Sequence, residues 1–446
     1  MDVLFELPEE QPQKPAERTC PQDARVYRPV RNQVEMVLRD LDSTLPEDHV
    51  ARSIWTFLGK LDLSAFYASI KAVLSRPGHP ASDPQVLLAL WLLATVDGIG
   101  KARQLGRLCH EHDAYRWMRG GVPVNYHMLS NFRVAHQKEM DEMMSQILAA
   151  MMSVGLVTLR HAAQDGMRVR ASAGSGSFRR EARLEQFLEE ARAEVARLAK
   201  EREAADSGVS RKQQAARERA VRERQERIEE ALRNLPELKA AQEKRKKKAS
   251  KAERAKMKEP RVSTTDPEAR VMKMADGGFR PAYNMQIATD VDSQVILGVN
   301  VTNSGEDAGQ AVPMVEQIKE RVKVYPDVYL ADGGFVKLED ITSLDRKGIE
   351  VYAPPPTRKS RGSNEAQAAA PQASDTPEVV KWRERMQTQE AKGVYKERAA
   401  TAECVNALAR ARGMTQLTIR GTQKVLSALL LLAITHNLMR WISLTT

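Results

Sequence analysis

The first third of the chain has hydrophobic residues at helical spacing. The tripeptide Ser-Asp-Pro at 82–84 predicts a helix start, because a capping side chain is followed by proline in the first turn. The residues after it, 86–93, are apolar on all sides of a helix and predict a buried core helix. A basic amphipathic stretch at 101–108 and a further helix at 125–136 follow around glycine turns. Residues 1–150 therefore form a predicted helical domain, either a helix-turn-helix or an ordinary helical bundle.

Residues 178–258 have a different composition, dominated by Glu, Arg, Lys, Gln and Ala. Apolar residues recur at spacings of three and four in two stretches, one beginning at Leu184 and one at Val221, with a turn signal at 207–210 between them. This pattern predicts two antiparallel helices; a single long charged helix or a disordered linker would have the same composition. The second stretch ends in the basic run KRKKKASK, 244–251, which is either a solvated tail or a phosphate-binding segment.

Strand and helix patterns alternate after the basic run. The stretches 284–288 and 295–301 alternate in polarity like strands, and two short apolar strands at 328–331 and 350–353 flank a predicted helix at 336–347. This order predicts a mixed sheet with helices on its faces.

The remaining segments connect or extend these elements. Residues 1–30 are polar and contain prolines, which predicts an extended arm. A helix is predicted at 306–323, a loop at 354–378, and helices from Val379 to the end of the chain.

The balance of charges adds a class of partner to this picture. The chain has 446 residues, with 69 Lys and Arg against 59 Asp and Glu, a net charge of +10. An excess of positive charge suits DNA, although a basic soluble protein without a nucleic-acid role has the same balance. Cys109, His110 and His112 lie close together, but no second ligand pair follows at a spacing suited to zinc.

No membrane segment is expected. The first residues lack the basic and apolar segments of a signal peptide. The most apolar run, 426–434, is far shorter than the roughly 20 residues of a membrane-spanning helix. We therefore expect a soluble, cytoplasmic protein.

Two aspartates stand where strands are predicted to end. Asp165 follows the stretch His-Ala-Ala-Gln and precedes a glycine, which predicts an exposed aspartate at a strand end. Asp332 follows an apolar strand and precedes two glycines. Ligands bind at the carboxyl ends of strands in such sheets. The pentapeptide ADGGF occurs twice, so Asp276 in the first copy is a rival for Asp332 in the second; an Asp-Gly pair is also common in simple turns.

A third carboxylate, Glu403, lies in the predicted helix KGVYKERAATAECVNALAR. Asn406 and Arg410 follow it at spacings that place all three on one helix face, and Tyr395 and Arg398 precede it by about two turns. A glutamate on a helix is ordinarily a solvated surface residue, so the position alone does not indicate function.

Taken together, these motifs resemble bacterial insertion-sequence transposases of the DDE, RNase H-like class. The resemblance is strongest to the group called insertion-sequence family 1182, with family 5 as its neighbour. It extends from about Pro46 to the C-terminus and includes, in order, LLALWLLATVDGIGKARQLGRLCHEHDAYRWMRGG, QDGMRVRASAG, TTDPEARVMKMADGGFRPAYNMQIATD, YLADGGF, YKERAATAE and TIRGTQKVLSALLLLAITHNL.

The resemblance implies a catalytic, metal-binding set of Asp165, Asp332 and Glu403. It implies two Mg²⁺ ions, with Mn²⁺ as a substitute, and a reaction that cleaves DNA at the element's ends and joins the 3′ ends to target DNA. The DNA-binding candidates are three residues that surround Glu403 and five in the basic run: Tyr395, Arg398, Arg410, Lys244, Arg245, Lys246, Lys247 and Lys248. The alternatives are a non-catalytic DNA-binding scaffold and an RNase H-like nuclease without strand transfer.

The expected architecture is multidomain, with α and α/β parts. An N-terminal helical DNA-binding domain, 1–150, precedes an RNase H-like mixed-sheet catalytic domain whose two parts, 151–177 and 259–446, flank an antiparallel helical-hairpin insertion at 178–258. The expected partner is double-stranded DNA, both terminal inverted repeats and target. We expect a homodimer or higher oligomer on DNA, in the cytoplasm and associated with the nucleoid, without membrane contact.

Overall fold

The computed structural model describes residues 38–70, 80–203, 208–355 and 370–445, together with positions 32, 34, 36 and 72. The arm predicted at 1–30 and most of the loop predicted at 354–378 lie outside the described residues. Two compact units make up the chain, Met1–Asp40 and Leu41–Thr446, and every element below belongs to the second.

Short helices form the N-terminal part of this unit, as predicted. They are η1 (Asp42–Thr44), α1 (Val50–Leu58), α2 (Ser64–Tyr67), α3 (Pro84–Val96), α4 (Ala102–Glu111), α5 (Asp113–Arg119), α6 (Tyr126–Ala135) and α7 (Gln137–Ser153). The start of α3 is as predicted, because the Asp83 side chain accepts a hydrogen bond from Gln85 N and Pro84 is the first helical residue. The helix is buried almost throughout, and the indole of Trp91 donates to Leu129 O at 2.9 Å.

A mixed sheet follows, again as predicted. Its strands are β1 (His161–Arg170), β4 (Arg270–Lys273), β5 (Phe279–Asp290), β6 (Ile296–Thr302), β7 (Val328–Leu330) and β8 (Glu350–Tyr352). The order along the sheet is β4-β5-β1-β7-β8, and β6 also pairs with β5. The pairs of β5 with β1, β4 and β6 are antiparallel, whereas β1 with β7 and β7 with β8 are parallel.

Helices cover the sheet. They are α11 (Ala311–Val322), α12 (Leu338–Asp345), α14 (Pro377–Gln387), α15 (Gln389–Arg398), the π-helical turn η4 (Ala399–Glu403), α16 (Cys404–Ala411) and α17 (Thr422–Thr445). The helix predicted from residue 306 begins five residues later than expected, at Ala311. Gly309, with a φ of 84°, interrupts the turn before it, and the Asp307 side chain is hydrogen-bonded into the sheet.

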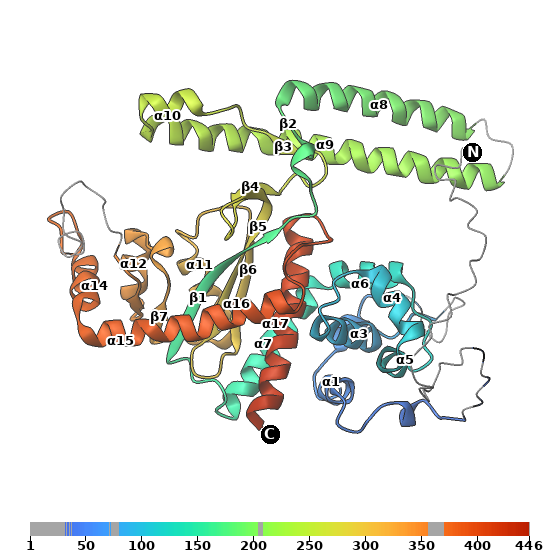
Figure 1. Cartoon of the computed structure of the whole chain (residues 1–446), viewed down its shortest axis with the longest axis horizontal. Coiled ribbons are helices and arrows are strands. Elements are labelled where there is room, and N and C mark those ends of the chain that lie inside the picture. The colour runs from blue at the N-terminus through green and yellow to red at the C-terminus, as the bar shows by residue number, and fades with distance from the viewer. Residues whose placement is uncertain are drawn as a thin grey trace, which may run out of the picture. The chain divides into compact units, whose positions relative to one another are not determined.

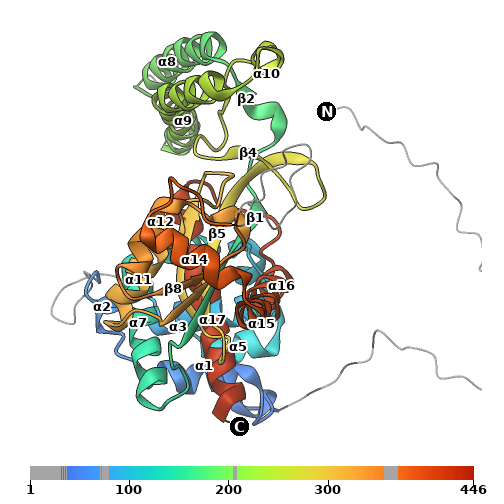
Figure 2. The same ribbon diagram turned by 90° about the vertical axis from the view of Figure 1, so that its left-hand side faces the viewer.

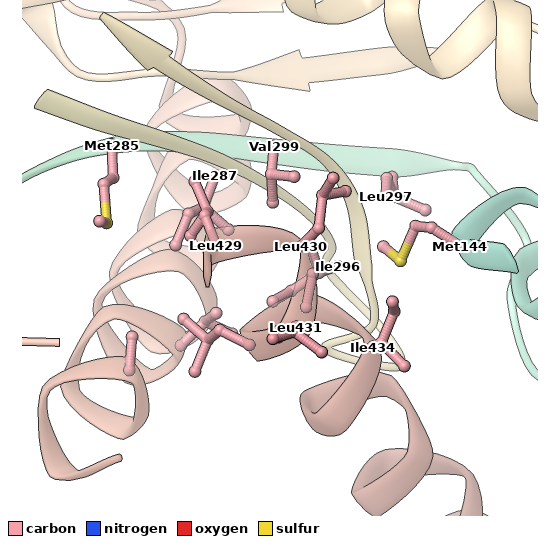
Figure 3. Close-up of a cluster of buried hydrophobic side chains, with 14 of the residues drawn as sticks. Met144, Met285, Ile287, Ile296, Leu297, Val299, Leu429, Leu430, Leu431 and Ile434 are labelled. Carbon is pink, nitrogen blue, oxygen red and sulfur yellow. The ribbon is translucent and has the colours of Figure 1, made fainter. Parts of the chain in front are cut away.

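The last helix, α17, is the central core helix. It packs on β6 and also on α3, α6 and α7, between the sheet and the N-terminal helices (Figure 1). Figure 3 shows Leu429 and Leu430 of α17 against Ile287 and Val299 of the sheet, and Ile434 beside Met144 of α7. By length and composition this 24-residue helix could cross a membrane, which the short run 426–434 had not indicated, but 72% of its most apolar window is buried within the protein.

The N-terminal helices and the sheet share one hydrophobic core. Two glycines in left-handed conformations, Gly98 after α3 and Gly413 after α16, bring their loops together, since a Cβ on Gly413 would lie only 2.7 Å from Gly98 O. The Asn437 amide of α17 bonds both backbone groups of Ile296, at 2.8 and 2.9 Å. A deletion of residues 1–150 would therefore expose the core of the rest.

The region 178–258 contains two paired helices, α8 (Glu181–Glu203) and α9 (Gly208–Lys248), followed by α10 (Lys251–Lys256). Figure 2 shows α8 and α9 side by side. Ion pairs from Glu181 to Lys239 and from Arg192 to Glu229 require antiparallel directions. Residues 208–210, predicted as part of the turn, belong to α9, which begins at Gly208; residue 207 lies outside the described residues, with 204–206.

A small sheet at the base of these helices was not predicted. Its strands are β2 (Phe178–Arg179), after the 3-10 turn η2 (Ser175–Ser177), and β3 (Val262–Ser263). The chain enters the helical pair after β2 and leaves it before β3, and these two strands are paired. Val262 is buried with Leu184 and Ile228 in a separate hydrophobic cluster.

Buried His436 makes the fold sensitive to acid. Burial, together with the charges of Arg412 and Arg440, lowers the pKa of His436 from 6.5 to about 4. The neutral ring fits its contacts, with Nε2 donating to Gln294 O at 2.8 Å and Nδ1 facing the Arg412 guanidinium at 3.4 Å. A depressed pKa in the folded state means that this stability is present above pH 6.5 and is lost as the pH falls toward 4.

We expect the free energy of unfolding to fall by about 2 kcal/mol between pH 7.5 and pH 5 through His436 alone. Urea unfolding of the parent and of His436→Gln at the two pH values measures the contribution of His436 to this change in the free energy of unfolding. Glutamine retains a donor and an acceptor but does not titrate, so the variant should lose correspondingly less stability. An equal loss in both proteins would assign the acid sensitivity to other groups.

Candidate active site

A pocket opens where β1 runs past the end of β7. The strand β7 pairs only with residues 161–163 of β1, and the next backbone bonds on that side are those of Arg170 with Thr415 and Leu417. The pocket along this edge has a volume of about 460 Å³. Its charged lining consists of four aspartates and four arginines: Asp165, Asp276, Asp307, Asp332, Arg168, Arg170, Arg280 and Arg410.

Asp165 lies in the middle of β1, and the prediction of an exposed aspartate at a strand end is wrong. The strand continues to Arg170 because β5 pairs with it over its whole length, and Gly166 does not interrupt the ladder. The side chain is 20% exposed. Its Oδ2 accepts a hydrogen bond from Asn406 Nδ2 at 2.8 Å. Burial raises the pKa of Asp165, against the lowering effect of Arg398, and the charge of Asp332 raises it further.

The two copies of ADGGF have different surroundings. Asp332 follows β7, as predicted, and its Oδ1 accepts from Gly334 N at 2.7 Å at the start of the 3-10 turn η3 (Gly333–Phe335). Asp276 lies in the turn between β4 and β5, where Arg280 binds it at 2.7 Å and lowers its pKa. Both line the pocket, but Asp332 is the one whose charge acts on Asp165.

Arg398 links Asp165 to Glu403. Its Nη1 lies 3.7 Å from Asp165 Oδ1 and its Nη2 lies 3.7 Å from Glu403 Oε1. Glu403 ends the π-helical turn, a feature frequent at functional sites, and its side chain is 61% exposed. Asn406 and Arg410 lie on one face of α16, as the helical spacing predicted; Asn406 bonds Asp165 and Arg410 lines the pocket. The ring of Tyr395 lies 5.7 Å from the Arg398 guanidinium.

The basic run lies on the helical pair and does not line the pocket. Lys244, Arg245 and Lys247 are exposed at the end of α9. Arg245 binds Glu306 of the sheet domain at 3.0 Å, and Lys246 binds Glu243 at 2.6 Å. These pairs are exposed, so each contributes little stability and can be exchanged for a phosphate.

The carboxylates fit a hard divalent cation by donor chemistry. Asp165 and Asp332 are oxygen donors at one pocket, and their mutual repulsion is of the kind that a cation relieves. Among the described residues, however, no three Asp, Glu, His or Cys side chains are close enough to hold a metal ion. Asp165, Asp332 and Glu403 therefore do not form the expected three-carboxylate metal site in this structure. Instead, Arg398 provides the positive charge between Asp165 and Glu403.

Sequence reasoning missed a group of polar residues at this pocket, of which Asp307 is itself part of the lining. Asn284 and Gln286 of β5 and Asp307 form a hydrogen-bonded group on the other face of β1. The alternation of Asn and Gln with apolar residues in YNMQI is the available signal, but alternation by itself predicts a solvent-facing side.

Comparison with protein families gives two matches. Residues 39–135 match the family described as Transposase domain (DUF772), and residues 252–438 match the family described as Transposase DDE domain. No curated protein and no solved structure matches the chain significantly. The second match includes Asp276, Asp332 and Glu403, whereas Asp165 lies between the two matched segments. Two matches to transposase families in one chain, together with a mixed sheet most of whose strands lie in the DDE match, support the function of an insertion-sequence DNA transposase.

Proposed function

We propose that the protein cleaves DNA at the ends of an insertion sequence and joins the freed 3′ ends to target DNA. The catalytic residues in this proposal are Asp165, Asp332 and Glu403. The observation that carries it is the pocket at the edge of β1, where aspartates from two adjacent parallel strands meet arginines within a chain that has two transposase domains.

In this proposal Asp165 and Asp332 hold Mg²⁺ or Mn²⁺, and Glu403 joins them after it leaves Arg398. When bound there, the ions would supply Lewis-acid chemistry at a water or a 3′-hydroxyl and at the leaving oxygen. Asn406 orients Asp165 by donating to its Oδ2. Arg410 in the pocket lining, with Arg398 once it is released, offers positive charge to the DNA phosphates.

The finer assignments belong to the same proposal. The chain is placed in insertion-sequence family 1182, with family 5 as its neighbour, and its catalytic domain is RNase H-like with the helical pair, 178–258, as an insertion. The N-terminal helices, within 1–150, recognise the element's ends. The protein acts on DNA as a homodimer or higher oligomer, in the cytoplasm with the nucleoid.

A two-step assay separates this function from its alternatives. Labelled duplexes that carry the element's ends are incubated with the protein and Mg²⁺, and pre-cut ends are then offered a target plasmid. Cleavage and joining support the proposal. Cleavage without joining indicates a nuclease, and binding without cleavage indicates a scaffold.

Recognition of the ends should depend on α4. Arg103 and Arg107 are exposed on this helix, Arg103 over the ring of Tyr126 and Arg107 beside Glu111. Replacing both arginines with alanine should lower the ratio of affinities for end and scrambled duplexes by about tenfold or more, because contacts to bases contribute roughly 1–3 kcal/mol each. Competition binding at fixed salt measures the ratio.

A matched control removes the same charge elsewhere on the N-terminal helices. Lys60 and Lys138 are exposed, and their replacement by alanine should leave the ratio unchanged. Point variants are preferable to deletion of 1–150, because α3 and α6 pack on α17. If the two double variants have equal ratios, α4 does not recognise the ends.

A further inference from the structure

A buried polar network lies on the side of β1 opposite to the Asp165 side chain, and its members Asp307 and Arg168 extend to the strand edge, where they line the same pocket as Asp165. Side chains alternate between the two faces of a strand, so Gln164 and Arg168 point away from the Asp165 side. On β5 their neighbours are Gln286 and Asn284, which face Gly166 and Arg168 in the register. Gln164, Gln286 and Asn284 are completely buried. Buried amides require hydrogen-bond partners, so this face needs a specific acceptor.

Asp307 is that acceptor. It lies between β6 and α11, and its Oδ1 accepts from Asn284 Nδ2 at 2.6 Å and from Gln286 Nε2 at 2.8 Å. The Arg168 guanidinium lies 3.8 Å from the other carboxylate oxygen. The side chain is only 15% exposed, so these contacts hold it in a single place.

The network also reaches the strand that precedes Asp332. Gln164 Nε2 donates to Gln286 Oε1 at 2.8 Å, and the Tyr329 hydroxyl of β7 donates to Gln164 Oε1. Tyr329 is buried and lies three residues before Asp332. Hydrogen bonds among these buried side chains therefore connect β1, which carries Asp165, with β7, which Asp332 follows.

Asp307 lies directly against Gly166 of β1. A Cβ built on this glycine would clash with Asp307 Oδ1 and would lie 2.8 Å from Gln286 Nε2. The carboxylate of Asp307 consequently rests against the backbone of the residue directly after Asp165.

We propose that Asp307 is a positioning residue. Through its contacts with Gly166, Asn284 and Gln286 it holds β1 in the position relative to β7 at which Asp165 and Asp332 can bind the same ligand. This inference rests on the proposed function for the identity of that ligand, a divalent cation. Without the carboxylate, two buried amides lose their acceptor and the backbone at Gly166 loses its support. Hydrogen-bonded buried polar groups favour one arrangement, and here the amide donors of Asn284 and Gln286 are both satisfied by Asp307.

The test uses the full-length protein, first without metal and then with Mn²⁺. In the metal-free protein, hydrogen exchange of the peptide covering 161–170 reports on β1. Mn²⁺ binding is measured from the electron paramagnetic resonance signal of the free ion, and it reports on Asp165 and Asp332. Asp307→Ala should accelerate exchange in this peptide about tenfold and weaken Mn²⁺ binding about tenfold. Asp307→Asn retains the Oδ1 acceptor and should remain within about threefold of the parent in both.

Two further variants make the test decisive. Glu306→Ala removes a neighbouring carboxylate that pairs with the exposed Arg245, and both readouts should stay at the parent level. Gly166→Ala forces Asp307 away from β1 and should match Asp307→Ala, which covers the case in which the latter fails to fold. Lower thermal stability with parental exchange and Mn²⁺ affinity would overturn the positioning role. If the parent itself does not bind Mn²⁺, the proposed function fails, while the exchange data still decide whether Asp307 holds β1.

Discussion

Replacing Asp332 with asparagine is expected to reduce cleavage of end-bearing DNA by roughly a thousandfold, whereas the same change at Asp276 should retain most of the activity. The reason is electrostatic: the charge of Asp332 acts directly on Asp165 at the edge of β1, while Asp276 is neutralised by Arg280 in a turn. Loss of a charged group that stabilises the transition state has effects of this size. Single-turnover cleavage of labelled ends in Mg²⁺ measures the difference.

The matched variants are Asp165→Asn and Glu403→Gln, which should lose activity as Asp332→Asn does. Binding to the ends and thermal unfolding should stay close to the parent for all four proteins. An inactive Asp276→Asn beside an active Asp332→Asn would show that the first ADGGF copy carries the catalytic aspartate. Full activity of Glu403→Gln would mean that this exposed side chain remains with Arg398 throughout the reaction.

The second large effect concerns non-specific DNA affinity. Alanine at Lys244, Arg245, Lys246, Lys247 and Lys248 should weaken binding to end and scrambled duplexes alike, by on the order of a hundredfold at low salt. Removing five cations that each neutralise one phosphate would flatten the slope of log affinity against log salt by about 4.5, at about 0.9 per phosphate; the side chain of Lys248 lies outside the described residues. Because Glu306 and Glu243 already compete for Arg245 and Lys246, we expect a smaller change of about 3.

Glu306→Ala is a control that should change the salt dependence of binding in the opposite direction. It releases Arg245, so the salt slope should steepen by up to about 0.9. Salt titrations with end and scrambled duplexes check both expectations. A quintuple variant that lost only end-specific binding, with an unchanged slope, would show that the basic run recognises sequence.

Some pocket residues follow from local signals, and others do not. Asp332 could be found because an apolar strand precedes it and glycines follow it, and both features lie within a few residues. The position of Asp165 within β1 could not be found in this way. The end of β1 is decided by pairing with β5, which is more than a hundred residues away in the chain, and a strand partner of sufficient length overrides the local turn preference of Asp-Gly.

By itself the sequence determined the start of the core helix α3, the apolar faces of helices and the alternation of strand and helix, because capping and periodicity act over a few residues. The start at Pro84 and the apolar faces of α8 and α9 are of this kind. Only the tertiary structure decided that Arg398 stands between Asp165 and Glu403, and that Asp307 rests against Gly166. Those contacts join segments far apart in the chain, so they exist only once the sheet and its covering helices have been packed into one core.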